Sequence, residues 1–77
     1  MQIVYNSEQF YIVAYPAEEA YEVIDKTAGR GSFFGGDLAH RFHDSMRDMA
    51  AKDPSTEALD DFIANFGLPL TLPAVYH

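Results

Sequence analysis

The chain has 77 residues, of which 12 are Asp or Glu and five are Lys or Arg, so its formal net charge is −7. Because no basic cluster is available to contact a phosphate backbone, we expect no nucleic-acid partner. The absence of cysteine excludes disulfides and thiolate metal sites. The sequence has neither an export signal nor a run of about 18 apolar residues, so we expect a soluble cytoplasmic protein that does not contact a membrane.

The N-terminal half predicts an antiparallel β-meander. Its apolar runs are rich in β-branched and aromatic residues, and the polar stretch Asn6–Gln9 between the first two is suited to a hairpin turn. Pro16 ends the second run, and Thr27–Gly31 is suited to a turn before a short fourth strand. The four predicted strands are Ile3–Tyr5, Phe10–Tyr15, Tyr21–Lys26 and Ser32–Phe34.

The C-terminal half predicts two amphipathic helices. The first begins at Asp37, where the apolar residues change to a helical period. Asp53 is placed to cap the second helix with Pro54 at its first position, and Gly67 is placed to end it in a left-handed conformation. The apolar positions are Leu38, Phe42, Met46 and Met49 in the first helix, and Leu59, Phe62, Ile63 and Phe66 in the second.

These elements predict a single α+β domain over residues 1–77. A four-stranded antiparallel meander is followed by two helices that pack on one face of the sheet, and an extended C-terminal tail completes the chain. A chain of this length buries only about 60% of its unfolded surface, so the core is small. Its expected members are Ile3, Phe10, Ile12, Val23, Phe42, Met46, Leu59, Phe62, Ile63 and Phe66.

The tail, Leu68–His77, is apolar, and its two prolines exclude a helix and a central strand. We expect it to lie extended along an edge of the sheet or on a partner. Leu68, Leu70 and Leu72 alternate, which is typical of a segment buried on one side. The tail therefore either closes the core of its own chain or packs on another chain.

The strand Phe10–Tyr15 predicts a protein partner, because it is apolar on both sides and two helices cover only one side of a four-stranded sheet. The uncovered side suits a homodimer contact or a contact with another protein, since tyrosine buries area while its hydroxyl stays satisfied. Shielding by the tail or a loop of the same chain is the alternative. The predicted interface residues are Tyr11, Val13, Tyr15, Leu70 and Leu72.

The segment GRGSFFGGDLAHRFHD, Gly29–Asp44, combines glycines with two histidines. Asp37 follows the glycines and would repel a phosphate, so the glycines indicate turns rather than an anion site. Asp37, His40 and Asp44 share one helical stripe and are candidate metal ligands. A solvated helix face with charge pairs explains the same three residues without a metal.

No residue pattern indicates catalysis, since no serine lies in a nucleophile motif such as GxSxG and no carboxylate pair is placed across a predicted cleft. We therefore expect no enzyme activity and no cofactor. An acidic helix surface that imitates DNA is a further alternative, although acidic surfaces more often serve solubility. Its residues would be Asp44, Asp48, Glu57, Asp60 and Asp61.

Four short motifs, in this order, resemble a small bacterial family catalogued only as a domain of unknown function. They are VYNS (Val4–Ser7), YEVIDK (Tyr21–Lys26), GGDLAHRF (Gly35–Phe42) and PAVYH (Pro73–His77). The resemblance spans nearly the whole chain, which favours a complete protein, and it implies no activity or site residue. Our interpretation is a non-enzymatic protein-interaction or regulatory module. The alternative is a small-molecule or metal-binding protein that uses the helix of His40 and His43.

Overall fold

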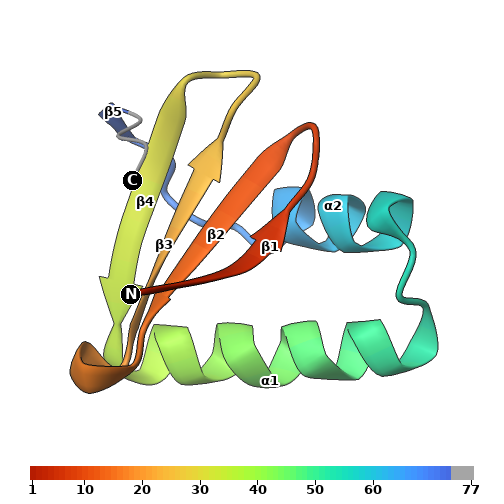
Figure 1. The fold of residues 1–77 in the computed structure, drawn as a ribbon, viewed down its shortest axis with the longest axis horizontal. Helices are drawn as coiled ribbons and strands as arrows, with labels where there is room; N and C mark the ends of the chain where they lie inside the picture. Colours follow the sequence, from red (N-terminus) through yellow and green to blue (C-terminus); the bar gives the residue numbers. More distant parts are fainter. Residues whose placement is uncertain (74–77) are drawn as a thin grey trace.

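The computed structural model describes residues 1–73 and has the predicted α+β architecture, an antiparallel sheet followed by two helices (Figure 1). Helix α1 starts directly at the end of the fourth strand, and α2 turns back along it. A 3-10 turn, η1 (Pro16–Glu18), joins the second and third strands. The elements are β1 (Gln2–Asn6), β2 (Phe10–Tyr15), β3 (Ala20–Asp25), β4 (Arg30–Gly35), α1 (Gly36–Lys52), α2 (Thr56–Asn65) and β5 (Leu72–Pro73).

The sheet has the order β1-β2-β3-β4-β5, and every neighbouring pair is antiparallel. The predicted meander of four strands is therefore confirmed. The described part of the tail adds β5 to the free side of β4, with Leu72 beside Gly31 and Pro73 beside Arg30. Pro73 is tolerated there because an edge strand does not need every backbone donor.

A β-bulge in β1 decides which of its side chains enter the core. Ile3 pairs with Val13 and Tyr5 pairs with Ile12, so Val4 is the extra residue between them. Cross-strand partners share a face of the sheet. Ile3 therefore lies on the face opposite the helices and is 57% exposed, so its predicted place in the core is wrong. Tyr5 packs against the helix-side core instead.

The main core lies between the sheet and the two helices. Phe42 of α1 is central to it, with ring centroids 5.4 Å from Phe34 and 5.2 Å from Phe66. Among the predicted core residues, Phe10, Ile12, Val23, Phe42, Leu59 and Ile63 are buried, and Met46, Phe62 and Phe66 are half-buried against the cluster. Within residues 1–73, no helix is long and apolar enough to span a membrane.

The start of α2 differs from the prediction by two residues. Ser55, rather than Asp53, is the N-cap, and its hydroxyl accepts a hydrogen bond from the backbone N–H of Ala58 at 3.2 Å. Asp53 ends α1 and accepts from the N–H of Ser55 through its carboxylate, at 3.1 Å. The hydrogen bond from the backbone N–H of Ser55, and then one from its side chain, lower the pKa of Asp53. Both serine and aspartate suit a cap, so composition alone does not separate them.

Candidate binding groove between β1 and α1

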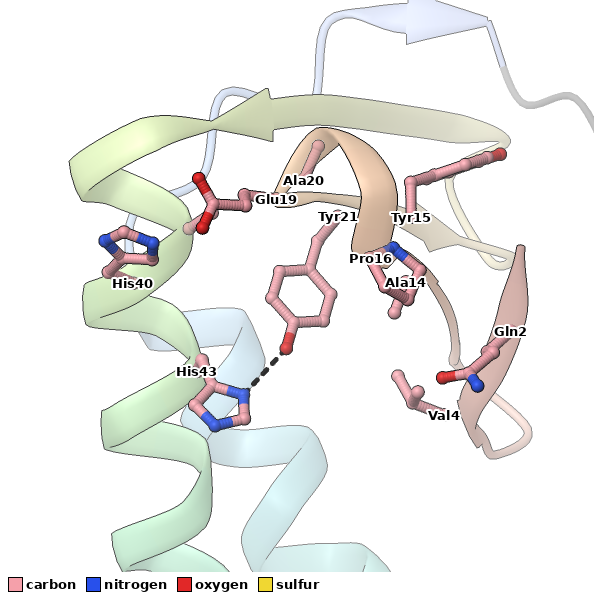
Figure 2. A pocket seen from close by; sticks show the side chains of 11 residues that line it. Gln2, Val4, Ala14, Tyr15, Pro16, Glu19, Ala20, Tyr21, His40 and His43 are labelled. Carbon is pink, nitrogen blue, oxygen red and sulfur yellow. Dashed lines mark hydrogen bonds between the residues drawn. The ribbon is translucent and has the colours of Figure 1, made fainter.

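A pocket of about 370 Å³ lies between the edge strand β1 and the first half of α1 (Figure 2). Gln2 and Val4 line it from β1, and His40 and His43 line it from α1. Its floor is formed by the small side chains Ala14, Ala20 and Ala39 of β2, β3 and α1. The small floor residues leave room that bulkier side chains would fill.

A second pocket, of about 220 Å³, continues this space along α1 to Met46 and Arg47. The two pockets share Val4, Tyr21 and His43. We call the two together the β1–α1 groove. The bulge contributes directly to it, because the inserted residue Val4 lines both pockets and is 50% exposed.

Tyr21 and His43 meet at the middle of the groove, with the tyrosine hydroxyl 2.8 Å from Nδ1 of the histidine (Figure 2). Their rings are stacked, with an interplanar angle of 21°. Tyr21 also packs edge-on against Phe42 at 5.6 Å, so the core fixes its position. Burial raises the pKa of Tyr21 above its ordinary value, which already lies well above neutral pH, so the phenol keeps its proton there. When Tyr21 donates to Nδ1, a neutral His43 ring holds its own proton on Nε2.

The two ends of the groove carry opposite charges. Glu19 lines the end beside η1, and Arg47 lines the other end. Glu19 has a left-handed backbone, with φ 49° and ψ 48°, and its N–H donates to the carbonyl of Pro16 at 3.2 Å. This conformation costs a non-glycine residue about 1 kcal/mol or more, so the turn is fixed by its surroundings.

The three predicted metal ligands lie on the surface of α1, and a metal site there stays a prediction. Asp37, His40 and Asp44 are all exposed, and residues 1–73 contain no group of three His, Asp or Glu side chains that could hold a metal ion. Asp44 instead lies 3.8 Å from Arg47, as expected for charge pairs on a solvated helix face. His40 also lines the groove.

The predicted interface residues fall into three environments. Tyr11 and Val13 are buried, at 7% and 0% exposure, in a second cluster with Ile24 on the face opposite the helices, and Tyr15 is half-buried against it. We call this the Tyr11 face. Leu70 is half-buried against the main core. Leu72 is 51% exposed and lies beside Gly31 at the Tyr11 face. A partner on this face therefore stays a prediction, and Tyr11 and Val13 offer it little free surface.

The acidic residues of the two helices are not equivalent. Asp60 faces the hairpin of β1 and β2 and accepts hydrogen bonds from the hydroxyls of Tyr5, at 2.7 Å, and Ser7, at 2.8 Å. It therefore ties α2 to the sheet. Asp44, Asp48, Glu57 and Asp61 are exposed.

Sequence reasoning placed both histidines on one helix but missed Gln2, Val4 and Tyr21, which complete the groove. The sequence does not predict the role of Val4, because a bulge is not visible in a two-residue alternation. Tyr21 begins a predicted strand, and its contact with His43 spans 22 positions of the sequence. The available signal was the pair of adjacent apolar residues Val4 and Tyr5 in an edge strand.

Comparison with known proteins agrees with the resemblance in the four sequence motifs. Residues 1–77 match the model of a family described as "Protein of unknown function (DUF3567)". The chain is 33% identical, over 85 residues, to a Burkholderia thailandensis protein named "Protein BTH_I0359", and the match covers 100% of both chains. The comparison with solved structures finds no match. The chain thus belongs to the DUF3567 family.

Proposed function

We propose that the protein is a non-enzymatic protein-interaction module, and that it binds an extended polypeptide segment as a strand added to the edge of β1. The observation that supports this is the coincidence of an unpaired strand edge with the β1–α1 groove. Within residues 1–73, β1 pairs with β2 alone, and the groove runs along the helix side of β1. Backbone hydrogen bonds supply affinity in this binding mode, and pockets for alternate side chains supply specificity.

The spacing of the groove suits such a segment. Alternate side chains of a strand point to the same face and lie roughly 7 Å apart. The two pockets follow one another along α1 and share His43, so consecutive helix-side residues of an added strand would enter one pocket each. Apolar side chains suit the floor of Ala14, Ala20 and Ala39.

The edge of β1 is also weakly protected against pairing. Natural edge strands often carry charged side chains or proline, which oppose the addition of another strand. The sequence of β1, QIVYN, contains neither. Its bulge at Val4 is one protective device, but it also turns Val4 toward the groove.

The central pair of the groove supports binding rather than catalysis. A general base or a nucleophile must be deprotonated at the pH of the reaction. Burial raises the pKa of Tyr21 further above neutral pH, so its hydroxyl stays protonated. Its hydroxyl and the ring of His43 are already engaged with each other at 2.8 Å, which suits a fixed wall of a binding site.

Selection from a phage-displayed library of random peptides tests the proposal. We expect enriched peptides with apolar residues at alternate positions. Val4→Lys should abolish their binding, because it places a charge in both pockets and at the paired edge. Phe33→Lys is the matched control: Phe33 is 52% exposed, against 50% for Val4, and it lies in β4 on the Tyr11 face.

Three results would overturn the proposal. The first is a selection that enriches no peptide when the parent sediments as a monomer. The second is an enriched set that binds Val4→Lys as well as the parent. The third is an enriched set that loses binding equally in Val4→Lys and Phe33→Lys. Circular dichroism of both variants checks that each remains folded.

A small-molecule site is the second candidate function, and one observation favours it. Both histidines line the larger of the two groove pockets, whose volume of about 370 Å³ is sufficient for a small ligand, since such pockets begin at about 300 Å³. A fragment library screened by NMR would test it through the amide signals of Ala20 and Ala39. Fragments that shift these signals in both the parent and Val4→Lys would favour this candidate over a bound strand.

A further inference from the structure

We infer that the segment bound at β1 is the β1 strand of a second copy of this chain, so that the two edges pair antiparallel about a two-fold axis. The inference rests on the proposed function and names its partner. Antiparallel pairing is self-complementary, because each strand presents to the other the same pattern of donors and acceptors that it receives.

Charge is the first argument for a second copy. Two chains of net charge −7 repel each other, and the repulsion is smallest where neither surface is charged. Residues 1–7 contain no charged side chain, and Glu8 is the first. The edge of β1 is therefore a place where two copies of this acidic chain can meet without opposing carboxylates.

Exposed apolar surface is the second argument. Met1, Ile3 and Val4 are 65%, 57% and 50% exposed, and they are three of the five large hydrophobic residues that are most exposed within residues 1–73. Ile3 lies on the Tyr11 face, whereas Val4 lies in the groove on the helix side. A strand paired against β1 would therefore gain apolar contacts on both faces of the sheet.

Closure is the third argument. A contact between the two different edges of a sheet would permit open-ended association. An antiparallel pair of β1 strands about a two-fold axis uses the same edge of both copies, so the two copies form a closed dimer.

Sedimentation equilibrium of the full chain across the micromolar range tests the inference. We expect a dimer for the parent and a folded monomer for the double variant Ile3→Lys/Val4→Lys, because lysines at both edges repel each other. The control is Phe33→Lys/Leu72→Lys, whose residues are 52% and 51% exposed on the other strands β4 and β5. It should remain a dimer. Because Phe33 and Leu72 both lie on the Tyr11 face, this result would also exclude a dimer that pairs through that face.

A second measurement covers the case in which the edge variant does not fold. In a mixture of isotope-labelled and unlabelled parent protein, filtered NOEs between protons of β1 residues should report contacts across the dimer. A parent that sediments as a monomer overturns the inference, as does a dimer without these contacts. A monomeric parent that still selects peptides leaves the proposed function intact, whereas one that selects none removes both.

Discussion

The hydroxyl of Tyr21 lies 2.8 Å from Nδ1 of His43, which links the sheet to α1 at the middle of the β1–α1 groove. Tyr21 is held in turn by Phe34 and Phe42, whose ring centroids are 6.2 Å and 5.6 Å from its own. The core therefore fixes the tyrosine, and the tyrosine orients an exposed histidine. This arrangement keeps one wall of the groove in place without a bound partner.

Replacing Tyr21 with Phe should lower the free energy of unfolding by about 1 kcal/mol, because one hydrogen bond is lost while the ring packing is retained. Urea denaturation measures this change. The ¹⁵N shift of His43 Nδ1 should also move, since that atom loses its donor. In the control Tyr15→Phe, the lost hydrogen bond is to Glu22, so the His43 signal should not change. Equal His43 shifts in the two variants would contradict the geometry.

The hydrogen bond between Tyr5 and Asp60 predicts a loss of stability in alkaline solution. Burial first, and then the hydrogen bond and the charge of Asp60, raise the pKa of Tyr5 to about 12. In the unfolded chain the phenol has its ordinary pKa near 10. The stabilisation is therefore complete below pH 10 and is lost as the pH rises through about 12, because the unfolded state releases this proton first.

Urea denaturation at pH 8 and at roughly pH 11 checks this prediction, since these values lie on either side of the ordinary tyrosine pKa. The free energy of unfolding should fall between them, and it should fall less in Tyr5→Phe, which cannot ionise at this position. In Asp60→Asn the free energy of unfolding should fall by an amount between those of the parent and Tyr5→Phe, because burial still raises the pKa of Tyr5 after the carboxylate is removed. If the free energy of unfolding falls as much in Tyr5→Phe as in the parent, the loss of stability cannot be assigned to Tyr5.

Local patterns in the sequence predicted most of the fold. The residues of Phe10–Tyr15 form β2 with those same bounds, and the apolar spacing from Asp37 onward gives a helix that begins one residue earlier. Gly67 has φ 91°, as expected for a left-handed residue after α2. These features depend on side-chain period and backbone sterics, which neighbouring residues determine.

The candidate site was much less predictable. The groove depends on the Val4 bulge and on a contact between β3 and α1, and neither is visible in short-range periodicity. The error at Ile3 has the same origin, because an inserted residue reverses which side chains face the core. The sequence does not decide between the two interpretations of the tail, since alternation in Leu68–Leu72 does not say which surface buries it.

The corner between β4 and α1 predicts a contrast between two adjacent glycines. Gly36 has φ 61°, so Gly36→Ala should cost about 1 to 2 kcal/mol from backbone strain alone. Gly35 has φ −134°, and an added Cβ would lie at ordinary contact distance, 3.6 Å from the carbonyl oxygen of Glu19. Gly35→Ala should therefore change stability by less than about 1 kcal/mol. Thermal denaturation shows which of the two variants is less stable. A Gly35→Ala variant less stable than Gly36→Ala would contradict these backbone conformations.

The tail predicts different roles for two leucines that lie two positions apart. Leu70 is half-buried against the main core, whereas Leu72 is 51% exposed in β5. Full burial of a leucine contributes roughly 1.5 to 3 kcal/mol, so Leu70→Ala should lower the free energy of unfolding by about 1 to 2 kcal/mol. Leu72→Ala should lower it by less than about 0.5 kcal/mol, because little apolar surface is removed from a packed environment.

Urea denaturation and sedimentation of Leu70→Ala and Leu72→Ala together separate the two interpretations of the tail. If the tail closes the core of its own chain, stability falls in Leu70→Ala and the molecular mass is unchanged in both variants. If Leu72 instead contacts another chain, its replacement lowers the mass in solution while the free energy of unfolding of the isolated chain stays the same. Because Leu68 and Leu70 pack against the main core, we expect the first result. A stable Leu70→Ala variant would show that this packing contributes little.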